Sequence, residues 1–296
     1  MSIPNTLYEA MYQRGMRPDP SRLMLNGKPQ RFPVSTDKGG SKSGWLIGYE
    51  VYGGFIATAG DWKTGERFTI KSRPSQNLSA LEQFERNTEL AKKIESDRRA
   101  RAQVQLEVCS QARSLVESAG PVSPANRYLI RKNIKGTSVF ESNDVLLVPI
   151  VNGDLQIVNC QRIYPNGSKR FLKGGEVRGC FHLIGDFSKE NLIIAEGYAT
   201  GASIHEFTGS TVVCALTASN LPAVASVVRA LLPDTTIMIY ADNDHRAAKN
   251  VGREYGNRAA ELINAGLSWP SPCSDSCTCT DFNDSINCMQ GGIQYV

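Results

Sequence analysis

The chain has 296 residues, of which 41% are hydrophobic, and a formal net charge of +4 at pH 7. This size allows one sizeable catalytic core and one small domain, and the weak charge excludes a uniformly basic nucleic-acid-binding surface, so any such contact must use local patches. No apolar stretch approaches the roughly 20 residues that span a bilayer, and the start has no signal-peptide pattern. We therefore expect a cytoplasmic protein without a membrane partner.

Changes in composition along the chain divide it into four predicted segments. They are a small β-rich leader domain (1–75), a helical connector (76–120), a basic α+β subdomain (121–187) and an α/β catalytic domain with a cysteine-rich tail (188–296).

Short apolar runs separated by glycine-containing turns, at 44–49 and 54–57, predict strands in the leader domain. Trp45 and Trp62 have two interpretations there. Burial in a small core is favoured, because both rings are large and apolar. The alternative is that they stack on single-stranded DNA beside Arg31, which would neutralise a phosphate.

The connector is rich in Glu, Lys, Arg, Gln and Ala, which predicts helix over most of its length. A polar and basic tract at 96–101 interrupts its apolar stripe, so we expect one long exposed helix, or two helices, rather than a buried core element. The basic tract could contact nucleic acid, but a solvated helix face is favoured.

The basic subdomain contains two predicted hairpin turns, at Asn152-Gly153 and at Pro165-Asn166-Gly167. Runs of charge are usually solvated faces. This run stands directly before an acidic segment, however, so its cations are candidates for binding phosphate groups of a nucleotide or a template. The candidates are Arg162, Lys169, Arg170 and Lys173.

The catalytic segment reads as alternating strands and helices, which predicts a parallel sheet flanked by helices. The expected strands are 192–195, 211–216 and 237–240, and the expected helices are 199–207, 221–232 and 246–265, with Asn220 as the N-cap of the second helix. Because parallel strands end at one edge of a sheet, residues directly after them should meet there.

Carboxylates follow the first and the third of these strands. They are Glu196, on a turn opened by Gly197, and the pair Asp242 and Asp244. Two carboxylates one residue apart can face one hard cation, so the site suits Mg²⁺ or Mn²⁺. An Asp-x-Asp alone could equally be a turn that opens the next helix, but its combination with Glu196 favours a metal site.

The Glu-Gly and Asp-x-Asp motifs, followed by Asp281-Phe282-Asn283-Asp284, resemble the Toprim domain of primases, topoisomerases and related nucleases, and in particular its primase branch in plasmids, phages and phage satellites. The resemblance implies one or two metal ions on Glu196, Asp242 and Asp244, with Asp284 as a further ligand. It implies supporting roles for Gly197, Asp281 and Asn283. Thr200 stands where replicative primases of bacteria carry another acidic residue, which leaves the number of ions open.

The resemblance extends to the basic subdomain, to the segment PANRYLIRKNI at 124–134 and to the leader domain. It implies a DNA primase that makes short RNA primers on single-stranded DNA from ribonucleoside triphosphates by Mg²⁺-dependent nucleotidyl transfer, for replication of a mobile element or phage in a bacterial host cell. A separate helicase is expected, because the chain has no Gly-x4-Gly-Lys-Ser/Thr motif. The alternatives are a Toprim nuclease that cleaves DNA or RNA, and a non-catalytic accessory protein that binds single strands.

The eight cysteines fall into two groups. Four occur singly in predicted helices and strands and are expected to be reduced packing residues. The other four, Cys273, Cys277, Cys279 and Cys288, crowd the tail around the last acidic motif. They could bind Zn²⁺, but their spacing is not a standard zinc spacing, so a cysteine-rich loop without metal is favoured.

Overall fold

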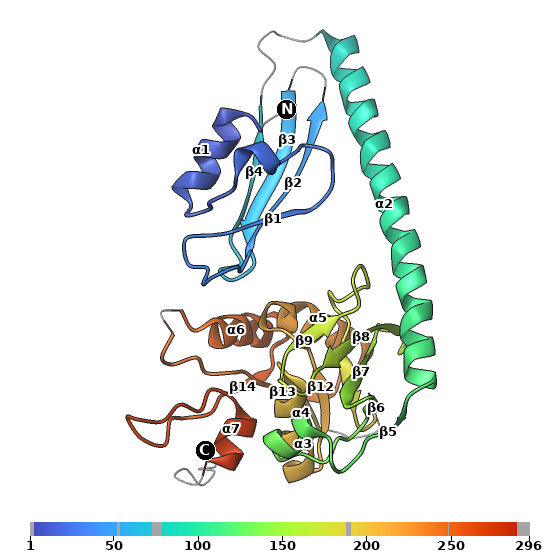
Figure 1. Cartoon of the computed structure of the whole chain (residues 1–296), viewed down its shortest axis with the longest axis vertical. Helices are drawn as coiled ribbons and strands as arrows, with labels where there is room; N and C mark the ends of the chain where they lie inside the picture. The colour runs from blue at the N-terminus through green and yellow to red at the C-terminus, as the bar shows by residue number, and fades with distance from the viewer. Residues whose placement is uncertain (1–2, 52–53, 73–78, 188–190, 248, 289–296) are drawn as a thin grey trace. The chain divides into compact units, whose positions relative to one another are not determined.

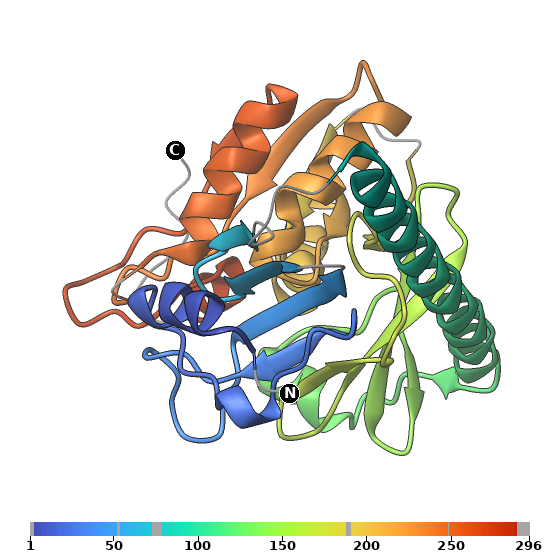
Figure 2. The same cartoon turned by 90° about the horizontal axis from the view of Figure 1, so that it is seen from above.

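The computed structural model describes residues 3–51, 54–72, 79–187, 191–247 and 249–288. The chain divides into two compact units, residues 1–102 and 103–296. The division falls inside one long helix, α2 (Ala80–Glu117), which is continuous in both views (Figures 1 and 2). In the described part of the chain, no helix combines the length and apolar character needed to cross a membrane.

The first unit is an antiparallel sheet of four strands in the order β1-β2-β3-β4, with helix α1 packed on it (Figure 1). Leu7 and Met11 of α1 are fully buried in one core with Leu46 and Phe55 of the sheet. The strands predicted from the glycine-bounded apolar runs are confirmed, whereas α1 was not predicted. The elements are α1 (Asn5–Gln13), a 3-10 turn (Pro20–Arg22), β1 (Gln30–Phe32), β2 (Gly44–Val51), β3 (Gly54–Asp61) and β4 (Arg67–Lys71).

The two tryptophans of this unit do not share the burial expected of them. Trp62 is 54% exposed, and the expectation that both rings form the core is wrong for this residue. The reason is local: β3 ends at Asp61, whose side chain accepts the Lys63 amide in a turn, so Trp62 lies beyond the sheet. Its ring lies against that of Trp45 at a tilt of 34°, with a centroid separation of 5.5 Å, and the Arg31 guanidinium lies 5.9 Å from its centroid.

Helix α2 confirms the predicted helical connector, and the polar tract at 96–101 does not break it. Most of its surface is exposed, as expected of a solvated helix. In the first unit its Asp97 accepts a hydrogen bond of 2.8 Å from the Tyr49 hydroxyl. In the second unit Val108 and Ala112 are buried against strands of an antiparallel sheet. Each end of the helix is therefore part of a different unit.

The second unit contains an antiparallel sheet in the order β5-β6-β7-β8-β9. Both predicted hairpin turns are confirmed: Asn152 accepts the Gln156 amide between β7 and β8, and Asn166 accepts the Ser168 amide between β8 and β9. Gly167 supplies the positive φ of +84° that the second turn requires. The elements are β5 (Gly120–Pro121), α3 (Arg127–Lys132), β6 (Phe140–Ser142), β7 (Val145–Val151), β8 (Ile157–Ile163) and β9 (Lys169–Phe171).

The second sheet of this unit is mostly parallel and has the order β10-β12-β11-β13-β14, with only β10 antiparallel to its neighbour. The predicted strands and helices are confirmed, except that the last long helix begins five residues later than expected. The elements are β10 (His182–Ile184), β11 (Asn191–Ala195), α4 (Tyr198–Thr208), β12 (Thr211–Cys214), a 3-10 turn (Ala218–Asn220), α5 (Leu221–Leu231), β13 (Thr236–Tyr240), α6 (Val251–Ile263), β14 (Gly266–Ser268) and α7 (Phe282–Asn287).

The fold is therefore mixed α/β, with one mostly parallel sheet and two antiparallel sheets, as the sequence predicted in outline. The finer subdivision into segments ending at residues 75, 120 and 187 stays a prediction. Asn220 differs from expectation, because its side chain does not cap α5. It donates instead to the carbonyls of Val177, Cys180 and Ala215 and accepts the Gly179 amide, so it joins the segment before β10 to the parallel sheet.

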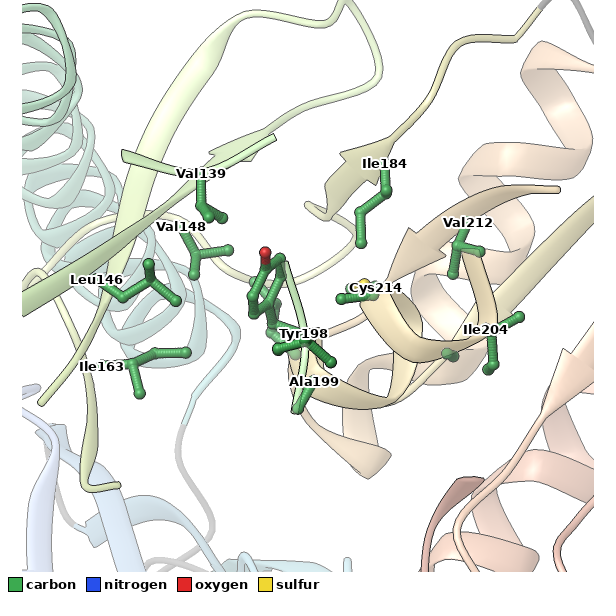
Figure 3. Close-up of a cluster of buried hydrophobic side chains, with 14 of the residues drawn as sticks. Val139, Leu146, Val148, Ile163, Ile184, Tyr198, Ala199, Ile204, Val212 and Cys214 are labelled. Carbon is green, nitrogen blue, oxygen red and sulfur yellow. The ribbon is translucent and has the colours of Figure 1, made fainter. Parts of the chain in front are cut away.

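The parallel strands are apolar on both faces and each face has its own covering layer. One face packs against α5 and α6, and the other packs against α4 and the antiparallel sheet. Tyr198, at the start of α4, is fully buried between the two sheets, with Val148 and Ile163 on one side and Cys214 on the other (Figure 3). Its hydroxyl donates to the Thr137 carbonyl at 3.0 Å. The two sheets of the second unit therefore share one core.

Candidate metal centre and its surroundings

The carboxylates predicted to meet at the sheet edge follow two strands that are direct neighbours. Strands β11 and β13 pair in parallel, with Ala195 opposite Tyr240. Glu196 is the next residue after Ala195, and Asp242 follows two residues after Tyr240. The register therefore brings both side chains to the same edge of the sheet, although they are far apart in the sequence.

The pKa values of these groups show that they share one electrostatic environment. Burial, followed by the charges of Asp244 and Asp281, raises the pKa of Glu196 to about 7. Burial, followed by the charge of Glu196, also holds the pKa of Asp242 well above its usual value, and Asp281 and Asp244 contribute. Lys169 lowers the pKa of both groups. Four carboxylates and one lysine thus interact at this sheet edge.

This donor set fits a divalent cation. Asp242 Oδ1 is buried and has no hydrogen-bond partner within the part of the chain that the structure describes. A cation would satisfy that oxygen and offset the mutual repulsion of the carboxylates, and hard cations such as Mg²⁺ take carboxylate oxygens. The carboxylate oxygens of this site do not yet surround one point. Among the described residues, only a group of cysteines has three candidate ligand atoms that all lie within 4.8 Å of one another.

The loop after β13 is held in place by asparagine side chains. Asn250 accepts the Asp244 amide at 3.1 Å and donates to Asn243 Oδ1 at 2.7 Å. The Asn243 side chain is 4% exposed and donates to the Pro270 carbonyl at 2.8 Å. Gly252 completes the loop, since a Cβ at this position would collide with the Asp242 carbonyl oxygen. This loop occupies residues that were predicted to be helical, which is why α6 begins at Val251.

The residues of the last acidic motif, 281–284, make two kinds of contact: some cap α7 or lie near the acidic cluster, and others hold α3 and α4. Asp281 caps α7 by accepting the Asp284 amide at 2.8 Å, and its pKa is raised by burial, as expected near other carboxylates. Asp284 itself forms an ion pair with Lys132 at 3.1 Å. Asn283 is 1% exposed and donates to the Lys132 carbonyl and to Ser203 Oγ, both at 2.7 Å. Asn283 therefore joins α7 to α3 and α4, and the charge of Asp281 contributes to the raised pKa values of Glu196 and Asp242.

The predicted basic residues do not gather in one place. On β9, Lys169 lies opposite Ile163, on the sheet face that packs against the parallel sheet. Its Nζ is 3.8 Å from the point that a Cβ on Gly197 would occupy, beside Glu196. Arg170 lies opposite Arg162, and since side chains alternate along a strand, both belong to the other face.

Lys173 follows β9 and is exposed. Arg162 has a buried Nε without a hydrogen-bond partner among the described residues. Of the four predicted phosphate-binding cations, the structure therefore places only Lys169 at the acidic cluster.

Two contributors were not predicted. Lys132, the partner of Asp284, lies in the basic segment at 124–134, so the sequence offered a signal for it. Asn250 had no such signal, because its role depends on the path of the loop after β13. His182, in contrast, is fully buried against Tyr198 and bonds the Pro149 carbonyl at 2.8 Å; burial lowers its pKa to about 4, as suits a packing residue.

Residues 191–291 match the family model described as Toprim domain. The chain is 28% identical over 280 residues to a DNA primase TraC of Escherichia coli, covering 88% of this chain and 26% of that protein. It is 30% identical over 263 residues to a second DNA primase TraC of the same organism, covering 83% and 18%. The chain thus spans only about a quarter or less of the length of these relatives.

Among solved structures, the chain resembles the DnaG primase catalytic domain bound to single-stranded DNA, with a TM-score of 0.42, 13% identity, and coverage of 62% of this chain and 75% of that chain. It also resembles the primase fragment of the bacteriophage T7 primase-helicase protein, with a TM-score of 0.40, 14% identity, and coverage of 57% and 75%.

The motif order, the strand-end carboxylates and the family match agree on residues 191–291, and the match to the curated relatives extends over most of the remaining chain. A Toprim domain implies a divalent metal ion, which the donor set described above fits. This chain therefore carries a Toprim domain and is related to the Toprim-domain DNA primases.

Proposed function

We propose that the chain is a DNA primase that condenses ribonucleoside triphosphates into short primers on single-stranded DNA and releases pyrophosphate. The observation that carries this proposal is the meeting of Glu196, Asp242 and Asp244 at one sheet edge with Lys169 from the neighbouring sheet. Carboxylates beside a phosphate-binding cation suit metal-assisted phosphoryl transfer. The relatedness to DNA primase TraC favours synthesis over the other reactions of such sites.

The residues that would hold Mg²⁺ or Mn²⁺ are Glu196, Asp242 and Asp244. When bound there, the ion supplies positive charge that stabilises the transferring phosphoryl group and the leaving pyrophosphate. Asp281 supports this cluster through its charge, whereas Asp284, which the sequence suggested as a ligand, is better assigned to holding Lys132.

The remaining residues act on the substrates. Lys169 would bind a phosphate of the incoming triphosphate, since its ammonium lies beside Gly197 at the edge of the acidic cluster. Glu196 is the candidate to accept the proton of the attacking 3′-hydroxyl, because its carboxylate follows β11 at the sheet edge where the cluster lies. Arg162, Arg170 and Lys173 are left as candidates for contact with the template backbone, away from the reacting atoms.

The partners follow from the same proposal. Single-stranded DNA and ribonucleoside triphosphates are the substrates, and a separate helicase would supply unwound template during replication of a mobile element or phage. The exposed Trp62, with Arg31 beside it, offers a stacking surface for a base and a cation for a phosphate in the first unit.

The proposal is tested by primer synthesis on mixed-sequence single-stranded DNA with labelled ribonucleotides and Mg²⁺ or Mn²⁺. The native chain should make short products, and Asp242→Asn should reduce their rate by about 100-fold or more, because one metal ligand and its charge are weakened. Asp234→Asn, an exposed position outside the site, is the matched control and should behave as the native chain.

Two results would contradict the proposal. Degradation of the template that is lost in Asp242→Asn would make the protein a Toprim nuclease. Tight binding of single-stranded DNA with neither synthesis nor cleavage would make it a non-catalytic accessory protein.

A further inference from the structure

The cysteine-rich tail contains a compact group of thiols that the proposed reaction does not use. The sulfurs of Cys273, Cys277 and Cys288 all lie within 4.8 Å of one another, and those of Cys273 and Cys288 are 3.8 Å apart. Cys279 is not part of that group of three, but its thiol interacts with those of Cys277 and Cys288. Three of the four cysteines, which have a non-standard spacing in the sequence, are therefore one group in the folded chain, and Cys279 lies two residues after Cys277 at its side.

The separation of these sulfurs matches a metal site better than a disulfide. Zn–S bonds of about 2.3 Å in tetrahedral geometry place sulfurs about 3.8 Å from each other. A disulfide requires about 2.05 Å between its sulfurs. Four thiolates around one ion form a complete tetrahedral set, which is typical of structural zinc sites.

The segment that carries three of these cysteines is held by contacts with the loop after β13 rather than by a helix or strand of its own. Residues 269–281 form no helix or strand. Cys277 is one of its few buried side chains. Long irregular loops of this kind need a specific reason to be ordered, and a bound metal ion provides one because its binding free energy becomes folding free energy.

The same segment lies against the loop of the acidic site. The Asn243 amide donates to the Thr280 carbonyl at 2.6 Å, His245 Nε2 bonds the Cys277 carbonyl at 3.1 Å, and the Arg246 guanidinium donates to the Asp275 carbonyl at 2.9 Å. Cys279 Sγ in turn donates to the Asp284 carbonyl at 3.6 Å. Order in the cysteine segment is thus transmitted directly to the residues around Asp242 and Asp244.

We propose that Cys273, Cys277, Cys279 and Cys288 bind one structural Zn²⁺, which fixes residues 269–281 against the loop that carries Asp242 and Asp244. Binding releases the thiol protons, so the site is weakened at low pH. The proposal does not depend on the proposed primase activity, because zinc content is measured without primer synthesis.

The test is elemental analysis of the full chain, purified under reducing conditions without chelator. The native chain should contain about one zinc per molecule. Cys277→Ser should lose it, whereas Cys109→Ser, a half-buried cysteine outside the cluster, should keep it. Replacement of zinc by Co²⁺ should give the absorption of a tetrahedral thiolate site.

A second measurement uses the native chain only, so that it does not depend on whether Cys277→Ser folds. Hydrogen exchange of the native chain is compared before and after removal of zinc by a chelator, and exchange should increase at residues 242–247 and 273–284 but not in β7 and β8. Absence of zinc from the native chain, zinc that persists in Cys277→Ser, or a disulfide between Cys273 and Cys288 found by mass spectrometry would each overturn the proposal.

Discussion

The acidic and the basic residues of the second unit are positioned by two different kinds of sheet. In the parallel sheet, β11 and β13 end side by side, so Glu196 and Asp242 meet despite their separation in the sequence. In the antiparallel sheet, Lys169 and Arg170 are adjacent in the sequence but belong to opposite faces. Parallel strands that end side by side bring together residues that are far apart in the sequence. Alternation of side chains along one strand separates residues that are adjacent in the sequence. Which residues form the site therefore depends on the sheet topology, not on their distance in the sequence.

The sharpest test of this difference is to replace the two neighbouring cations separately. Lys169→Ala should lower the rate of primer synthesis by about 100-fold, because it removes a charge aimed at the reacting phosphates. Arg170→Ala should change the rate by less than about threefold and should mainly reduce the dependence of DNA binding on salt. Steady-state rates and salt titrations of both variants measure this, and equal losses of rate in the two variants would show that both residues belong to one site.

The second test uses the stability of the acidic cluster. The pKa of Glu196 is raised to about 7, above its unfolded value, so the folded state binds the proton more tightly and the protein loses stability as pH rises through this range. Glu196→Gln removes that loss and should stabilise the metal-free chain by about 2 kcal/mol at pH 8, with little effect near pH 4.

Thermal unfolding in the presence of a chelator, at both pH values, measures this effect. Asp234→Asn serves as the exposed control and should show no such pH-dependent gain. A gain for Glu196→Gln that is the same at both pH values would mean that the carboxylate is not destabilised by its neighbours.

A smaller effect is expected in the first unit, at the turn that follows β3. Trp62→Ala should weaken binding to single-stranded DNA by about five- to tenfold, because one base loses its stacking partner. Phe84→Ala, which removes an exposed aromatic ring from α2, is the matched control and should bind as the native chain. Fluorescence anisotropy with a labelled oligonucleotide measures both. Unchanged binding of Trp62→Ala would remove this unit from the proposed template path.

The smallest effect concerns the core that the two sheets of the second unit share. Tyr198→Phe keeps the ring and removes only the hydrogen bond from the hydroxyl to the Thr137 carbonyl, so it should cost about 1 kcal/mol. Tyr12→Phe, at a half-exposed ring in the first unit, should have almost no effect. Denaturant unfolding measures both variants, and a neutral Tyr198→Phe would show that this contact does not help to join the sheets.

The parallel sheet was predicted well from the sequence, because buried parallel strands are continuous apolar runs. The polar residues that follow each run are therefore easy to identify. This is why Glu196, Asp242 and Asp244 could be placed together in advance. The basic residues could be identified from the sequence, but the sheet face to which each belongs could not, because it depends on the register of β8 with β9. The exposure of Trp62 and the pairing of Asp284 with Lys132 were likewise beyond the sequence, because each depends on contacts or turns formed only on folding.

If the strand-end carboxylates form one divalent-metal site, the full chain should bind Mn²⁺ there, and electron paramagnetic resonance follows this binding. We expect saturable binding by the native chain and by Asp234→Asn, and loss of that binding in Asp242→Asn. Equal binding by Asp242→Asn and the native chain would show that these carboxylates do not form a metal site.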